Sequence, residues 1–165
     1  MNEPLITWRG TVIAPWVDYN GHLRDAYYLL IFSFATDGLM DRIGLDAQGR
    51  ADTGHTLYTL ETHLNYLQEV REGIAIEVHT QLLGADSKRL HLFHSLRRTD
   101  DATLLATNEQ MLCNIDAAGP RSAPLAPAVA ARLAPLVESH RHRPRPPQAG
   151  RSIALPAAKG STDVR

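Results

Sequence analysis

The stretch from residue 17 to residue 44 constrains the fold more than any other part of the chain. After the segment Val-Asp-Tyr-Asn-Gly-His-Leu, the sequence favours about six turns of helix. Apolar residues recur there at the three- and four-residue spacing of one helix face, namely Leu23, Tyr27, Leu30, Ile31, Phe34 and Ala35. Tyr28, Leu29 and Phe32 cover much of the other face. A helix that is apolar nearly all round must be buried, so the sequence predicts a central core helix.

Asn20 and Gly21 stand where we expect this helix to begin. Asn accepts hydrogen bonds from free backbone N–H groups, and Gly allows a close approach of the chain. The helix start would then face the segment that contains Asp18, Asn20 and His22. Because free N–H groups at a helix start carry about half a positive charge, the sequence predicts that an oxyanion can form there.

Five segments have the residue pattern of strands: residues 7–14, 56–67, 74–82, 89–98 and 104–115. The polar segment 44–54 is typical of a loop, and a short Ala-rich helix is expected over residues 128–137. The strands after residue 56 predict an antiparallel meander. A twisted sheet wrapped around the central helix is the simplest α+β arrangement that buries both.

Length and composition favour a single domain without a charged macromolecular partner. The chain has 165 residues, of which 44% are hydrophobic, and its 17 basic residues balance 18 acidic ones. This balance gives no reason to expect nucleic acid or a membrane surface as a partner. The single cysteine, Cys113, and the lack of a signal-peptide pattern favour the cytoplasm. We expect a domain over residues 1–140 and a disordered tail over residues 141–165.

Asp18, Asn20 and His22 are the first candidate catalytic residues. Asp and Asn before a helix often serve only as caps, and that alternative stays open. A carboxylate beside the start of a buried helix can also attack a carbonyl carbon or activate water while N–H groups polarise the oxygen. This layout suits acyl transfer.

The N-terminal strand, the Asp-x-Asn-Gly-His segment, the long helix and the four-strand meander together resemble hotdog-fold acyl-CoA thioesterases of the 4-hydroxybenzoyl-CoA thioesterase type. Residues 16–30, 58–63 and 84–94 resemble more narrowly the betainyl-CoA thioesterases of carnitine breakdown. The resemblance spans about residues 8–137. It implies hydrolysis of a short-chain acyl-CoA, such as betainyl-CoA to betaine and CoA, without a separate cofactor. Arg24 departs from the pattern, since related thioesterases commonly carry a small amide residue there.

The resemblance also implies a homodimer, or a homotetramer, with active sites between subunits. Asp18 would be the nucleophile or general base, and the N–H groups of Gly21 and His22 would hold the thioester oxygen. Asn20 and His22 would orient the water or the carbonyl group. Glu61 and His63 would reach in from the partner subunit. Because alternating polar residues also form solvated sheet faces, a structural role for this pair stays open.

Aromatic and basic residues supply candidate contacts to the substrate. A trimethylammonium acyl group favours an aromatic cage. Four aromatic residues lie near the motif, namely Trp16, Tyr19, Tyr27 and Tyr28. Core packing remains an alternative for each of them. Lys88 and Arg89 could pair with CoA phosphates, although a solvated turn also accounts for them.

The eight histidines form no recognisable set of metal ligands, so we expect no metal. Two further functions stay open. A hotdog dehydratase would use His22 and Asp18 on 3-hydroxyacyl thioesters. A non-catalytic module would bind acyl-CoA without cleaving it.

Overall fold

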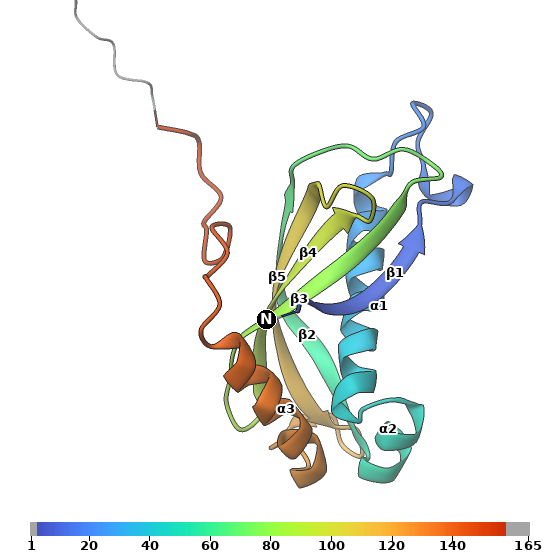
Figure 1. Ribbon diagram of the computed structural model, residues 1–165. Helices are drawn as coiled ribbons and strands as arrows, with labels where there is room; N and C mark the ends of the chain where they lie inside the picture. Colours follow the sequence, from blue (N-terminus) through green and yellow to red (C-terminus); the bar gives the residue numbers. More distant parts are fainter. Residues whose placement is uncertain (1–2, 158–165) are drawn as a thin grey trace, which may run out of the picture.

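The structure is a computed structural model, and it describes residues 3–157. Its main elements are β1 (Leu5–Thr11), the 3-10 helix η1 (Ala14–Trp16), α1 (Asp25–Ile43), α2 (Ala47–Thr53), β2 (His55–Tyr66), β3 (Ala75–Ala85), β4 (Arg89–Arg98), β5 (Leu104–Asp116), β6 (Arg121–Ser122) and α3 (Pro127–His140). The long strands form one antiparallel sheet in the order β1-β3-β4-β5-β2, and β6 pairs with β5. Figure 1 shows α1 running along one face of the curled sheet. The predicted α+β class is confirmed.

One face of α1 is buried, as predicted, but the helix is not enclosed all round, since Leu29 is 41% exposed. Its buried residues recur at helical spacing and are Tyr28, Ile31, Phe32, Ala35, Thr36, Leu39, Met40 and Ile43. The helix packs closely against β1 at Gly38, where an added Cβ would lie only 1.9 Å from the carbonyl oxygen of Thr7. Glycine therefore lets the central helix pack directly against a strand. Within residues 3–157, no helix is both long and apolar enough to cross a membrane.

The helix starts later than the sequence predicts. It begins at Asp25 rather than at Asn20 and Gly21, and Arg24 occupies the N-cap position without a capping side-chain hydrogen bond. The residues before it form a separate loop, in which Gly21 has a φ angle of 76°. This conformation suits Gly but interrupts a helix. The predicted cap is thus a turn that precedes the helix.

Two other predictions of local structure were wrong. The expected loop over residues 44–54 contains α2, whose N-cap residue Asp46 accepts a hydrogen bond from the N–H group of Gly49 at 2.8 Å. Strand β2 does not pair with β3, because it lies at the opposite edge of the sheet and pairs with β5. Only β3, β4 and β5 therefore form a meander.

The C-terminal helix α3 agrees with the expected Ala-rich helix and covers part of the sheet edge. Strand β1 pairs with β3 only as far as Thr80. Beyond that point, the N–H group of Leu82 donates to Nδ1 of His140 at 2.9 Å. A side chain of α3 thus satisfies an edge group that β1 does not reach.

Residues 141–157 contain no helix or strand, and two hydrogen bonds join them to the sheet. Nε2 of Gln81 donates to the carbonyl oxygen of Pro144 at 3.2 Å, and the N–H group of Gly150 donates to Oε2 of Glu109 at 2.6 Å. These bonds hold the segment to the sheet. The last part of the predicted tail, residues 158–165, lies outside the described residues.

A buried polar network joins α1 to the middle of the sheet. Oγ1 of Thr36 lies 3.1 Å from Nε2 of His94 and 3.0 Å from Oε1 of Gln110. On the other side of the ring, Oγ1 of Thr80 lies 2.8 Å from Nδ1 of His94. Phe32 stacks on the same ring at 5.8 Å between centroids. Burial lowers the pKa of His94 to about 3, so its imidazole is neutral in the folded protein.

Candidate active site

Residues 17–24 form a tight loop between η1 and α1. The N–H group of Gly21 donates to the carbonyl oxygen of Asp18 at 3.0 Å, which closes the turn. The N–H group of Leu23 donates to the carbonyl oxygen of Val70 at 2.8 Å and ties the loop to the segment that follows β2. Backbone hydrogen bonds therefore fix the position of the loop ahead of the helix.

The carboxylate of Asp18 lies inside this loop and is only partly exposed. Its Oδ1 accepts hydrogen bonds from the N–H groups of Asn20 at 2.8 Å and His22 at 3.2 Å. Desolvation raises the pKa of Asp18, but these two hydrogen bonds and the charges of His22 and Arg24 lower it more. Its pKa is therefore below the usual value, and the group is an ionised carboxylate at neutral pH.

The predicted oxyanion hole does not hold in this geometry. The N–H groups of Gly21 and His22 both donate to oxygens of Asp18. Because α1 begins at Asp25, these groups also lie outside its first turn. The field at the positive end of α1 remains as a source of stabilisation for an oxyanion.

Two cavities adjoin the loop, and His22 lines one of them. Its Nε2 lies 3.3 Å from Oε2 of Glu69. One cavity of about 350 Å³ is lined by His22, Glu69, Val70, Arg71, Ile74 and Arg98. A second, of about 300 Å³, is lined by Leu23, Asp25, Tyr28, Tyr66, Leu67, Gln68 and Glu69. We call the second cavity the acyl recess.

The sequence analysis missed Tyr66, Gln68 and Glu69 as site residues. All three lie at or just after the end of β2, in a segment that returns to the Asp18 loop. These residues could have been found only from the path of the chain, which passes near the start of α1 after β2. Without the strand order, this path could not be predicted.

The four predicted aromatic residues do not form one cage. Trp16 stacks on Tyr27 at 6.1 Å between ring centroids, and both belong to a cluster with Trp8 and Phe34. Tyr19 is 94% exposed at the tip of the loop. The structure therefore assigns Trp16 and Tyr27 to packing. Tyr19 points into solvent and does not form part of a binding cage.

Tyr28 occupies a different environment. It is buried, its hydroxyl donates to the carbonyl oxygen of Gln68 at 3.3 Å, and its ring meets the ring of Tyr66 edge-on at 5.2 Å between centroids. Both tyrosines line the acyl recess. Of the predicted aromatic contacts, Tyr28 is the one beside a cavity next to the Asp18 loop.

Glu61 and His63 lie on the face of the sheet opposite to α1. Thr62, between them, pairs with Gln110, which hydrogen-bonds to Thr36 of α1. Because successive side chains of a strand point to opposite faces, the neighbours of Thr62 point away from the helix. Within one protomer, the structure therefore does not bring this pair to the Asp18 loop.

The surroundings of this pair form a separate cavity of about 380 Å³ on the outer face of the sheet. His91 and Glu109 line it and share a hydrogen bond, with Nε2 and Oε1 2.6 Å apart. Residues 150–152 cover part of the cavity. The pair thus faces the C-terminal segment.

Lys88 and Arg89 lie at the far end of β3 from the Asp18 loop. Nζ of Lys88 donates to Oγ of Ser122 at 3.3 Å, and the Arg89 guanidinium forms an ion pair with Asp86 at 2.7 Å. Strand β3 has 11 residues, which at about 3.3 Å per residue separates its ends by roughly 35 Å. These cations do not reach the loop within one protomer.

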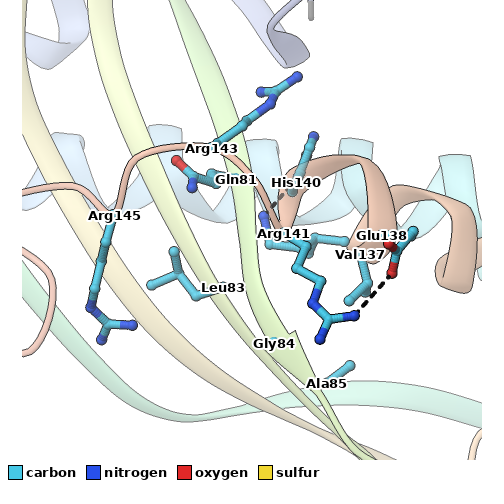
Figure 2. Close-up of a pocket in the computed structure, with 11 residues that line it drawn as sticks. Gln81, Leu83, Gly84, Ala85, Val137, Glu138, His140, Arg141, Arg143 and Arg145 are labelled. Carbon is cyan, nitrogen blue, oxygen red and sulfur yellow. Dashed lines mark hydrogen bonds and ion pairs between the residues drawn. The ribbon is translucent and has the colours of Figure 1, made fainter.

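A cationic cavity of about 390 Å³ lies between the end of α3 and β3 (Figure 2). Arg141, Arg143 and Arg145 line it. Arg141 pairs with Glu138 at 3.7 Å, and Nη2 of Arg143 donates to the carbonyl oxygen of Glu3 at 2.6 Å. Like Lys88 and Arg89, this cavity lies towards the end of β3 that is remote from the Asp18 loop.

Within residues 3–157, no group of three or more His, Cys, Asp and Glu side chains is arranged to hold a metal ion. Cys113 is a buried free thiol. The absence of a cofactor remains a prediction from the sequence.

Comparisons with known proteins place the chain in a family. The model of the thioesterase-like superfamily matches residues 12–133. The betainyl-CoA thioesterase of Pseudomonas aeruginosa is 54% identical over 159 residues, which cover 96% of this chain and 100% of the relative. A solved candidate thioesterase from Pseudomonas putida KT2440 is 52% identical, with a TM-score of 0.82 and coverage of 94% of this chain and 99% of that one. A Staphylococcus aureus protein solved in complex with CoA is 32% identical, with a TM-score of 0.86 and coverage of 93% and 97%. The chain therefore belongs to the thioesterase-like superfamily and has the hotdog fold.

Proposed function

We propose that the protein hydrolyses acyl-CoA thioesters and that betainyl-CoA is its substrate. The observation that carries the mechanism is the ionised carboxylate of Asp18, held by two backbone N–H groups in a loop whose His22 lines a cavity. The substrate assignment rests on the full-length similarity to the Pseudomonas aeruginosa betainyl-CoA thioesterase. CoA as part of the substrate is consistent with the CoA-bound Staphylococcus aureus relative.

In the reaction, a water oxygen forms a bond to the acyl carbon and the carbon–sulfur bond breaks. One water proton ends on the sulfur and gives the CoA thiol, while the other is released as the acyl group leaves as a carboxylate. Asp18 either takes the proton from the attacking water or attacks the carbon itself, after which water hydrolyses the anhydride. Asn20 and His22 lie beside the carboxylate and orient the water or the carbonyl group.

We further propose that the protein is a cytoplasmic homodimer whose sheets pair along β2. This strand is at the edge of the sheet, and Tyr58 and Leu60 on it are 48% and 59% exposed. Unpaired edges with apolar side chains favour pairing with another strand. In a joined sheet, Thr62 would face the helix side, whereas Glu61 and His63 would stay on the outer face. Light scattering should give a molecular mass twice that of one chain. A fully active monomer would contradict the proposed dimer.

Thiol release from a panel of acyl-CoAs tests the proposed function. The panel contains acetyl-CoA, isobutyryl-CoA, 3-hydroxybutyryl-CoA and betainyl-CoA. A thiol-reactive dye measures the free CoA that each reaction releases. We expect the highest kcat/KM for betainyl-CoA, with one thiol and one betaine formed per substrate consumed. No thiol release from any of these thioesters would overturn the proposal.

The same panel separates the two other functions. A dehydratase would convert 3-hydroxybutyryl-CoA into an unsaturated thioester without releasing thiol. A binding module would retain acyl-CoA unchanged, which calorimetry detects. Either outcome would replace hydrolysis as the function of the Asp18 loop.

A further inference from the structure

The acyl recess lies between the first turn of α1 and the end of β2. Its volume of about 300 Å³ is at the lower end of the range for small-ligand sites. Leu23 of the Asp18 loop lines the recess. It directly follows His22, whose N–H group is 3.2 Å from Oδ1 of Asp18. The recess therefore adjoins the loop that holds the Asp18 carboxylate.

Two tyrosine rings form a corner of the recess. The planes of Tyr28 and Tyr66 are 88° apart and their centroids 5.2 Å apart. Tyr28 is buried and held by Gln68, whereas Tyr66 is 52% exposed and donates its hydroxyl hydrogen to the carbonyl oxygen of Asp25 at 3.3 Å. In this edge-to-face contact Tyr28 is only 4% exposed, so Tyr66 supplies the aromatic surface open to a cation and Tyr28 supports its position.

Two carboxylates line this corner. Asp25 and Glu69 form no ion pair with Lys or Arg within the described residues, although Nε2 of His22 lies 3.3 Å from Oε2 of Glu69. Burial raises the pKa of Tyr28 to about 12, and the charges of Glu69 and Tyr66 add to this effect. Burial and the charge of Asp25 likewise raise the pKa of Tyr66. Both phenols therefore stay neutral, and the local field favours a cation.

We propose that the recess formed by Tyr28, Tyr66, Asp25 and Glu69 binds the quaternary ammonium group of a cationic acyl chain. The inference rests on the proposed thioesterase function and specifies which residues recognise the acyl group of the substrate. In a betainyl thioester, one methylene separates the ammonium nitrogen from the thioester carbon. The subsites for these two groups must therefore adjoin, as the acyl recess and the Asp18 loop do.

The test compares two substrates of the same shape that differ only in charge. Betainyl-CoA carries a trimethylammonium group, and 3,3-dimethylbutyryl-CoA carries a neutral tert-butyl group in its place. The specificity ratio is kcat/KM for the cation divided by kcat/KM for the neutral analogue. We expect this ratio to fall about 3- to 30-fold in Tyr66→Leu, because one wall of the corner is lost. Tyr66→Phe keeps the ring and should retain the wild-type ratio.

Charge is tested separately with Glu69→Gln and Asp25→Asn, which keep size and remove one negative charge each. Both should lower the same ratio, whereas Glu72→Gln, an exposed acidic residue on the same segment that does not line the recess, should not. These exposed replacements keep the test decisive if Tyr66→Leu does not fold. Equal losses for both substrates, or an unchanged ratio, would overturn the cation site. A wild-type protein that releases thiol from neither substrate would instead contradict the thioesterase function itself.

Discussion

Replacing Asp18 by Asn should lower kcat for thiol release from betainyl-CoA by about 10²- to 10⁴-fold. The amide oxygen of Asn can still accept the N–H groups of Asn20 and His22, so the loop should keep its shape. Only the negative charge that attacks carbon or accepts the water proton is lost. Initial rates with saturating betainyl-CoA, together with circular dichroism of the variant, measure both parts of this expectation.

Asp46→Asn is the matched control for this change. Asp46 also accepts a backbone N–H group through its carboxylate, at the start of α2, and Asn is an equally good N-cap residue. Its activity should equal that of the wild type. Turnover that stays unchanged in Asp18→Asn would remove Asp18 from the mechanism.

The free energy of unfolding should be about 2 kcal/mol lower at pH 5 than at pH 7 through His94 alone. The folded pKa of His94 is about 3 because of burial, whereas the unfolded value is about 6.5. The unfolded chain therefore binds the proton first as the pH falls. The contribution is complete above about pH 6.5 and is lost progressively towards pH 3, at about 1.4 kcal/mol per pH unit.

Urea unfolding at the two pH values measures this loss together with that of His140, whose pKa burial lowers to about 4, and NMR titration of the His94 ring separates the two contributions. The carboxylates with lowered pKa, such as Asp18, act in a more acidic window and do not produce the same slope between pH 7 and pH 5. A folded-state His94 ring that titrates near pH 6.5 would contradict the buried network. So would a stability that stays flat across this range.

The spacing of apolar residues predicted the helices and strands better than it predicted which strands pair with one another. The buried helix and the strands follow from apolar spacing, because each must bury one side whatever lies against it. The pairing of β2 with β5 could not be predicted, since alternation gives the faces of a strand but not its partner. The short helix α2 was missed because a polar segment with Gly at both ends is also typical of a loop.

The sequence predicted only the part of the site that is continuous in the chain. Asp18 stands out because the motif and the helix that follows are continuous in sequence. Tyr66 and Glu69 join it only through the path of the chain after β2. The resemblance placed Glu61 and His63 in the site from the partner subunit, and within one protomer they lie on the outer face of the sheet, away from α1.

The most direct test of the account is a structure of the Asp18→Asn variant with uncleaved betainyl-CoA. The account predicts a thioester carbon about 3 to 3.5 Å from the attacking oxygen, which belongs either to the side chain of residue 18 or to a water held by it. The trimethylammonium group should lie against Tyr28 and Tyr66. A thioester bound instead in the arginine-lined cavity beside α3, with the Asp18 loop empty, would contradict it.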